Sequence, residues 1–193
     1  MMIPEAVKQL HLCSAFRGYA IPLIDCVSCS DDTVIYVKDN DETHISEFST
    51  DANNENVFVG DNPQQTNICL LSIDHKLTNN HPGGIADCAV FNTEIFCFVE
   101  FKTNAEGRSL TSVEKTYEAA ISQIENTLRL FVEKINSAHV DIYKKVKEVV
   151  CHIVVASKFP RNLAMEQNYM VAFATKWRIE LSFENYQSFL EKY

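Results

Sequence analysis

Residues 85–102 read IADCAVFNTEIFCFVEFK, and this stretch decides the fold. Two apolar runs, IADCAVF and IFCFVEFK, flank a short polar connection at residues 92–94. This pattern predicts a β-hairpin in the interior of a sheet. Asp87, Glu100 and Lys102 nevertheless lie within the hairpin. A buried charge is costly unless it is paired, hydrogen-bonded or bound to a metal, so these three residues need an explanation.

The segments around the hairpin predict an α/β or α+β fold. Residues 68–77 (ICLLSIDHKL) read as a preceding strand. Apolar residues recur mostly at intervals of three and four over residues 113–135, which predicts an amphipathic helix of roughly six turns. Residues 149–156 (VVCHIVVA) are typical of a strand buried on both faces. Together these elements predict a central mixed β-sheet flanked by helices.

The ends of the chain complete a single domain over residues 1–193. Residues 39–67 are polar and read as an acidic insertion or long loop, with a short strand around residues 57–59. The other expected elements are a first helix at 4–17, strands at 20–27, 33–38 and 179–183, a helical segment at 163–177 and a terminal helix.

The charge of the chain is acidic and uneven. Residues 1–100 carry 15 acidic and 4 basic side chains, whereas residues 101–193 carry 11 and 13. Residues 39–62 hold seven acids and no lysine or arginine. This balance argues against a broad nucleic-acid-binding surface, which is normally basic. The acidic 39–62 segment instead suggests a protein partner.

Composition also bears on the location of the chain. No apolar run approaches the ~18–20 residues that a membrane helix needs. No basic leader with an apolar stretch opens the sequence, so we expect a cytoplasmic protein without a membrane partner. The seven cysteines are then expected to be reduced thiols, several of them buried. Cys26 and Cys29 form one CxxC, but no second ligand pair follows, so a zinc site is not favoured.

The three charged residues of the hairpin can meet at one end of it. Glu100 and Lys102 share a face because side chains alternate along a strand. With a turn near residue 93, Asp87 lies almost opposite Glu100. Two neighbouring carboxylates favour a cation between them, and Mg²⁺ suits oxygen ligands. Lys102 could then help to activate a metal-bound water or stabilise charge on a phosphate.

This arrangement of Asp87 followed by Glu100-Phe101-Lys102 resembles the PD-(D/E)xK nuclease superfamily. The resemblance covers about residues 68–157 and implies a restriction-endonuclease-like αβββαβ core. It also implies a nuclease, most simply a DNA endonuclease, that hydrolyses phosphodiesters with Mg²⁺ or Mn²⁺. Asp87, Glu100 and the Phe101 carbonyl would bind the metal, and Lys102 would serve the attacking water.

The resemblance also implies roles for other residues. Some branches carry a glutamine on the following helix, which Gln123 could match, with Glu118 and Glu125 as the alternatives on that helix. Glu5 is the one candidate for a ligand on the first helix. The chain departs from the family at residue 86, where alanine replaces the proline of the family's name.

Two alternatives to a nuclease site stay open. Glu100 and Lys102 could be a solvated ion pair, and Asp87 could belong to a turn. The fold could then be a catalytically inactive, acidic module that binds a basic protein or mimics DNA. A metal-binding structural domain without turnover is a third hypothesis.

The remaining polar and aromatic candidates have structural explanations as well. Asp74, with His75 and Lys76, could extend the metal site or protect a strand edge. His81 is expected in a loop. Lys158 and Arg161 could contact phosphates or lie in a solvated loop. Tyr169 and Trp177 are expected to pack against the core.

Overall fold

The computed structural model describes residues 2–51, 55–79, 81–107 and 109–190. Within these ranges ten strands form two sheets, a large one of order β1-β5-β6-β7-β8-β9 and a small one of order β10-β4-β2-β3. The strands of the large sheet are β1 (Val27–Ser30), β5 (Ile68–Ser72), β6 (Cys88–Phe91), β7 (Ile95–Lys102), β8 (Glu148–Val155) and β9 (Glu180–Ser182). Those of the small sheet are β2 (Val34–Asp39), β3 (Ser46–Ser49), β4 (Phe58–Asp61) and β10 (Tyr186–Ser188). The helices are α1 (Glu5–Gln9), α2 (Leu12–Ala15), the 3-10 helix η1 (Leu23–Cys26), α3 (Leu110–Ser137), α4 (Ile142–Lys145) and α5 (Leu163–Trp177).

The predicted hairpin is the centre of the large sheet. β6 and β7 pair antiparallel, with Cys88 opposite Val99 and Phe91 opposite Phe96. Asn92 forms the turn, since its side-chain oxygen accepts hydrogen bonds from the backbone N–H groups of Glu94 and Ile95, both at 2.8 Å. β7 then pairs in parallel with β8 along its full length. The prediction of a central mixed sheet flanked by helices is therefore confirmed.

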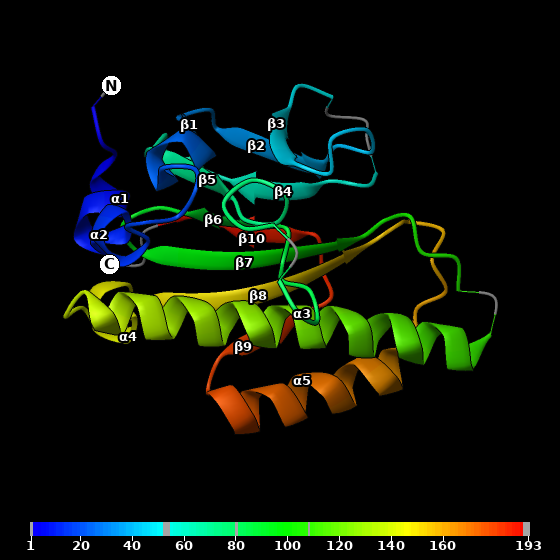
Figure 1. The fold of residues 1–193 in the computed structure, drawn as a ribbon. Coiled ribbons are helices and arrows are strands. Elements are labelled where there is room, and N and C mark those ends of the chain that lie inside the picture. Colours follow the sequence, from blue (N-terminus) through cyan, green and yellow to red (C-terminus); the bar gives the residue numbers. More distant parts are fainter. Residues whose placement is uncertain (1, 52–54, 80, 108, 191–193) are drawn as a thin grey trace.

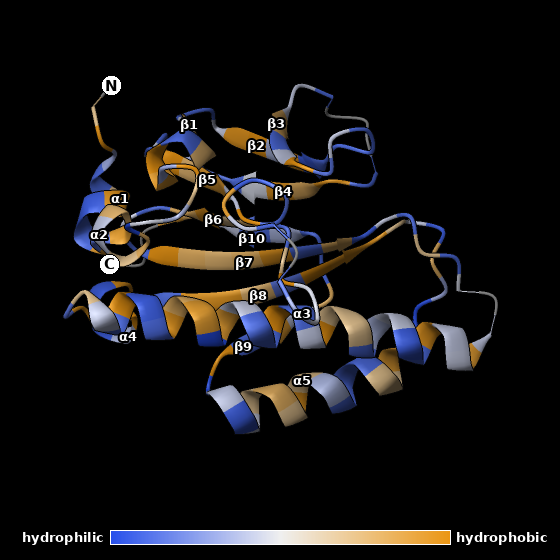
Figure 2. Ribbon diagram, viewed as in Figure 1, coloured by the Kyte–Doolittle hydropathy of each residue, from blue (hydrophilic) through white to orange (hydrophobic). Residues whose placement is uncertain are grey.

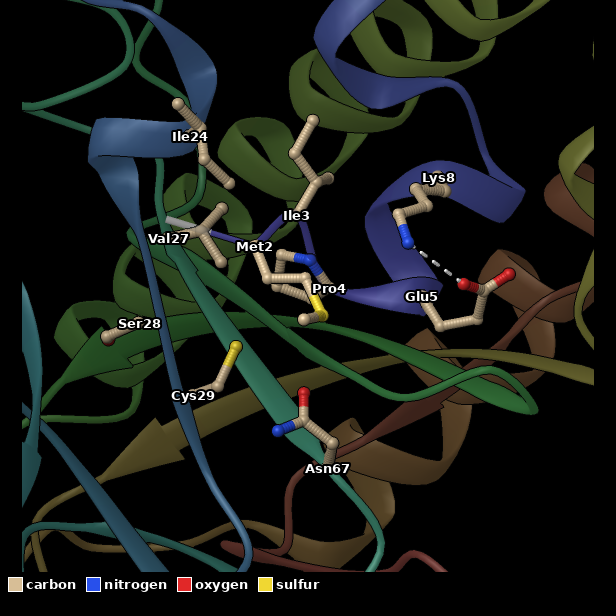
Figure 3. Close-up of a pocket in the computed structure, with 10 residues that line it drawn as sticks. All are labelled: Met2, Ile3, Pro4, Glu5, Lys8, Ile24, Val27, Ser28, Cys29 and Asn67. Atoms are coloured by element: carbon tan, nitrogen blue, oxygen red, sulfur yellow. Dashed lines mark hydrogen bonds and ion pairs between the residues drawn. The ribbon is translucent and has the colours of Figure 1, made fainter.

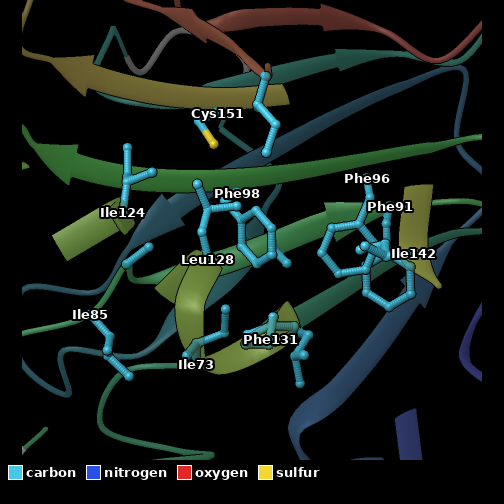
Figure 4. Close-up of a cluster of buried hydrophobic side chains, with 14 of the residues drawn as sticks. Ile73, Ile85, Phe91, Phe96, Phe98, Ile124, Leu128, Phe131, Ile142 and Cys151 are labelled. Atoms are coloured by element: carbon cyan, nitrogen blue, oxygen red, sulfur yellow. The ribbon is translucent and has the colours of Figure 1, made fainter. Parts of the chain in front are cut away.

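Helix α3 crosses from β7 to β8 and covers one face of the large sheet (Figure 1). It begins at Ser109, whose side chain accepts from the Ser112 N–H while the Ser112 hydroxyl accepts from the Ser109 N–H. Its apolar stripe packs on the sheet, where Phe131 meets Phe98 edge-on with ring centroids 5.1 Å apart (Figure 4). Figure 2 shows why the helix takes this position: hydrophobic positions run along α3 in a stripe, and β7 is hydrophobic over most of its length.

The small sheet packs on the other face of the large sheet. Ile35, Val37 and Phe58 of the small sheet share a buried cluster with residues of β5–β8. The polar segment 39–67 is therefore not one long loop, because it contributes β3 and β4; its residues 52–54 lie outside the described ranges. The predicted terminal helix is also wrong, since residues 186–188 form β10, which pairs in parallel with β4. Residues 191–193 lie outside the described part of the chain.

The first thirty residues also differ from the expectation. The single helix predicted over 4–17 is two short helices, because His11 between them has a left-handed backbone with φ 52°. The strand predicted over 20–27 is largely the 3-10 helix η1, and β1 begins only at Val27. No helix within the described residues combines the length and apolarity needed to cross a membrane.

Candidate functional site

The carboxyl end of β7 brings the predicted charged residues together. Cys88 pairs with Val99, so continuing the register by one residue sets Asp87 opposite Glu100. The backbone N–H of Phe101 donates to Asp87 Oδ2 at 2.6 Å and holds that carboxylate against β7. Asp87, Glu100 and Lys102 therefore lie at one end of the hairpin, as its turn position predicted.

Helix α3 adds Gln123 to this group. The Lys102 ammonium donates to Glu100 Oε1 at 2.5 Å and to Gln123 Oε1 at 2.6 Å. Gln123 is thus the residue of α3 that reaches the lysine. Glu118 is exposed, and Glu125 instead accepts from Lys176 and Trp177 on α5.

The loop before Asp87 is bound to the same helix. Thr127 Oγ1 accepts a hydrogen bond of 2.7 Å from the Ala86 N–H, and Asn126 Nδ2 donates to the Gly84 carbonyl at 3.0 Å. Gly84 has φ +74°, and a Cβ there would lie 2.9 Å from the Gln123 side chain. The absence of proline at residue 86 has a physical reason here. Proline has no backbone N–H and so could not donate the hydrogen bond that Thr127 accepts.

Glu100 is fully buried and Asp87 is half-buried, which is unusual for two neighbouring carboxylates. Glu100 is 0 % exposed, and its Oε2 is buried without a hydrogen-bond partner in the described residues. Burial raises the pKa of Glu100 well above its ordinary value, and the Asp87 charge raises it further. Burial likewise raises the pKa of Asp87 to about 7, against the lowering effect of the Phe101 N–H.

Two further aspartates influence the pair. The charges of Asp39, at the end of β2, and of Asp74, just beyond β5, both raise the pKa of Asp87. Asp39 also has a buried oxygen, Oδ1, with no partner in the described ranges. Asp74 had been considered from the sequence, but Asp39 was missed because it belongs to a different sheet. No periodicity in the sequence connects β2 to the hairpin.

The donor set fits a small, hard cation. An orphaned, fully buried carboxylate oxygen needs a proton or a cation, and Mg²⁺ is commonly held by one or two carboxylates with several retained waters. In the described part of the chain, no three His, Cys, Asp or Glu residues are grouped so that they could hold an ion. Asp87 and Glu100 would therefore have to act with backbone and water oxygens. The role predicted for the Phe101 carbonyl stays a prediction.

The other sequence candidates lie elsewhere. Glu5 pairs with Lys8 at 3.4 Å, and Gln9 of the same helix donates to the Thr93 carbonyl at the turn end of the hairpin. Glu5 is therefore at the end of β6–β7 remote from Asp87. Among the contacts described, His81 has one, between its Nδ1 atom and the carbonyl oxygen of the next residue, Pro82, at 3.1 Å.

Arg161, in the loop after β8, has a structural role. Arg161 binds Glu166 at 2.7 Å and Glu184 at 2.9 Å, so it bridges α5 and the β9–β10 connection. Lys158 lies exposed in the same loop. Trp177 is half-buried and donates to Glu125, and Tyr169 packs against Tyr117 in the core, as expected from the sequence.

Cys26 and Cys29 of the CxxC make separate contacts. The buried Cys26 thiol donates to the Pro22 carbonyl at 3.7 Å, whereas the Cys29 sulfur lies 3.1 Å from the sulfur of Cys69. The two cysteines of the motif thus have different partners.

Comparisons of this chain with models of protein families, with curated proteins and with solved structures gave no match. The chemistry of the site therefore has to be argued from its own residues.

Proposed function

We propose that the chain is a Mg²⁺- or Mn²⁺-dependent nuclease of the restriction-endonuclease-like type, with DNA as its first candidate substrate. One observation carries the proposal: Lys102 joins Glu100 to Gln123 directly beside Asp87. The order of elements supports it, since three antiparallel strands (β5–β7) are followed by a helix and a parallel strand. We place this activity in the cytoplasm.

Each side chain has a part in such a reaction. A divalent ion held by Asp87 and Glu100 would lower the pKa of a bound water and offset charge on the phosphate. The Phe101 N–H fixes Asp87, so its carboxylate needs no reorganisation to bind a cation. Gln123 and Glu100 orient the Lys102 ammonium, which is the one positive group in this contact network and can stabilise a negatively charged oxygen.

The acidic surroundings favour a second candidate function. A hollow of about 390 Å³ adjoins the end of β7, and its lining carries three acids, among them Asp39 and Asp41, against the single Lys38. Asn104, just after β7, donates to Asp41 at 3.0 Å and closes one side of the hollow. Such an environment repels phosphates, so an inactive module that binds a basic protein, or mimics DNA, is the alternative.

Cleavage assays separate the two functions. Single- and double-stranded DNA and RNA are incubated with the protein in Mg²⁺ or Mn²⁺, beside the variants Asp87→Ala and Lys102→Ala. The nuclease proposal expects cleavage by the unmodified chain and its loss in both variants. Lys144→Ala is the matched control, because Lys144 is on α4 and its side chain is 82 % exposed.

Calorimetry with Mn²⁺ completes the test. Mn²⁺ binding that disappears in Asp87→Ala would support the proposed metal site. Cleavage that persists in both Asp87→Ala and Lys102→Ala would contradict the assignment of the catalytic residues. Neither cleavage nor metal binding by the unmodified chain would leave the acidic binding module as the better explanation.

A further inference from the structure

One cysteine of this chain differs from the others in its exposure. All seven cysteines lie in the described residues, and Cys29 is the exposed one. Cys69, Cys88, Cys97 and Cys151 are 0 % exposed. A small reagent in solvent therefore reaches Cys29 before these buried thiols.

The strand register places a second thiol directly beside Cys29. β1 and β5 are antiparallel, and Cys29 and Cys69 are opposite each other in the ladder. Their sulfur atoms are 3.1 Å apart and share a hydrogen bond. The two positions belong to paired strands, so a bond between the sulfurs needs only a small movement of the side chains.

The surroundings suit an exchange reaction that starts at Cys29. The hydrogen bond from Cys69 lowers the pKa of the Cys29 thiol, whereas the pKa of Cys69 is raised by that same hydrogen bond and by burial. Cys29 also opens onto a hollow of about 510 Å³ between β1 and the N-terminal segment. Figure 3 shows its side chain in this hollow together with Met2, Pro4 and Val27, so the attacking thiol has space for a small molecule beside it.

We propose that Cys29 and Cys69 form a site of reversible thiol oxidation whose co-reactant is a small-molecule disulfide such as oxidised glutathione. The Cys29 thiolate attacks one sulfur of that disulfide, forms a mixed disulfide and releases one small thiolate. That thiolate takes the proton of Cys69, and the Cys69 sulfur then attacks the Cys29 sulfur and expels the second small thiolate. The two protein thiols lose two electrons and two protons, and the small disulfide is reduced to two thiols.

The crosslink has a defined structural effect. Residues 30–68 lie between the two cysteines and contain β2, β3 and β4, three of the four strands of the small sheet. A Cys29–Cys69 disulfide would therefore close this whole segment at its base and tie the edge strand β1 to β5. The same segment carries Asp39 toward the candidate metal site, but the oxidation does not depend on that site being a nuclease.

Intact-mass spectrometry of the full chain tests the proposal. The reduced protein is incubated with oxidised glutathione, and its mass is expected to fall by that of two hydrogens, with digestion recovering the Cys29 and Cys69 peptides crosslinked. Cys69→Ser is expected to retain glutathione on Cys29. Cys29→Ser is expected to gain neither the crosslink nor the adduct.

Cys13→Ser is the matched control, since Cys13 is a half-buried cysteine outside the pair, and it should behave as the unmodified chain. Three results would overturn the proposal: an unchanged mass, a crosslink that omits Cys29, or a glutathione adduct on Cys29 that Cys69 never displaces. Circular dichroism checks the fold of each variant. If Cys69→Ser does not fold, Cys29→Ser still tests whether oxidation starts at Cys29, because a substitution at this exposed position should not disturb the fold.

Discussion

Glu100 and Glu166 are both buried glutamates, yet their environments differ. They are 0 % and 3 % exposed. Glu166, on α5, accepts hydrogen bonds from the Tyr117 hydroxyl at 2.6 Å and from two nitrogens of Arg161, at 3.0 and 2.7 Å. Glu100 has the single ammonium of Lys102, and its second oxygen has no partner in the described residues.

The difference distinguishes a structural carboxylate from one that awaits a ligand. Hydrogen bonds and an ion pair offset much of the desolvation penalty of a buried charge, whereas each buried polar atom left without a partner costs about 1–3 kcal/mol. Glu166 ties α3, α5 and the loop after β8 together. The Oε2 atom of Glu100 has no partner in the described residues, so Glu100 is the residue from which we infer a ligand site.

The largest expected effect is on catalysis. Under the proposed nuclease function, Glu100→Gln should reduce Mg²⁺-dependent cleavage on the order of a thousandfold, ~4 kcal/mol, because it removes a carboxylate ligand. Glu166→Gln is the matched variant and should cleave at nearly the unmodified rate per folded molecule. Equal losses in both variants would remove the distinction between the two glutamates.

The next effect is the pH dependence of stability. The pKa of Asp87 is about 7 in the folded chain against about 3.9 when unfolded, so the folded state binds this proton more tightly. As far as this group is concerned, the metal-free chain is therefore most stable below about pH 4, and its free energy of unfolding falls by about 4 kcal/mol as the pH rises to 7. Urea unfolding at pH 5 and pH 8 measures the difference.

Two additions sharpen that experiment. Mg²⁺ should stabilise the chain more at pH 8 than at pH 5, because the cation takes the place of the proton. Asp87→Asn should flatten the pH dependence. A metal-free chain that is equally stable at both pH values would contradict the burial of these carboxylates without a cation.

Stability should also separate the two glutamates directly. Glu166→Gln is expected to lower the free energy of unfolding by about 2 kcal/mol, since Arg161 loses the more buried of its two carboxylate partners and keeps only Glu184. Glu100→Gln should change it less in metal-free buffer at pH 8, because the loss of the Lys102 contact is offset by removal of a buried carboxylate whose second oxygen has no hydrogen-bond partner in the described residues. Chemical denaturation with a chelator present measures both. A larger loss in Glu100→Gln than in Glu166→Gln would reverse the comparison.

The smallest expected effect concerns the loop before Asp87. Thr127→Val keeps the shape of the side chain but leaves the Ala86 N–H without its acceptor, which should cost about 1 kcal/mol and weaken Mn²⁺ binding. Thr116→Val is the control. The hydroxyls of Thr116 and Thr127 both donate to the carbonyl oxygen four residues earlier in α3, but among the contacts described Thr116 accepts no hydrogen bond from another segment. Indistinguishable Mn²⁺ affinities in the two variants would mean that Thr127 does not position Asp87.

The sequence predicts the part of this molecule that local pattern controls. Alternation along residues 85–102 and the Asn92 turn determine the register, and the register determines that Asp87 faces Glu100. The periodicity over residues 113–135 similarly predicts helix α3. These two inferences need only chain geometry over short separations. Gln123 is instead a candidate through the family resemblance alone, and the structure brings its side chain to Lys102.

The small sheet could not be predicted because its pairing is not local. β3 (SEFS) is short and polar enough to read as loop, and although a short strand is expected around residues 57–59, its pairing with β10 from the far end of the chain is not. Tertiary pairing there overrides local preference. The sequence does not indicate Asp39 or the Cys29–Cys69 contact for the same reason, since each depends on which strands become neighbours.

Helix α3 holds both halves of the candidate site. Gln123 and Thr127 are one turn apart, and one of them binds Lys102 while the other binds the loop that carries Asp87. The helix therefore holds the hairpin at two points about 6 Å apart along its axis, the rise of four residues. Anyone who transplants these residues into another scaffold has to move the hairpin and the helix as one unit, because the hairpin alone would lose both contacts.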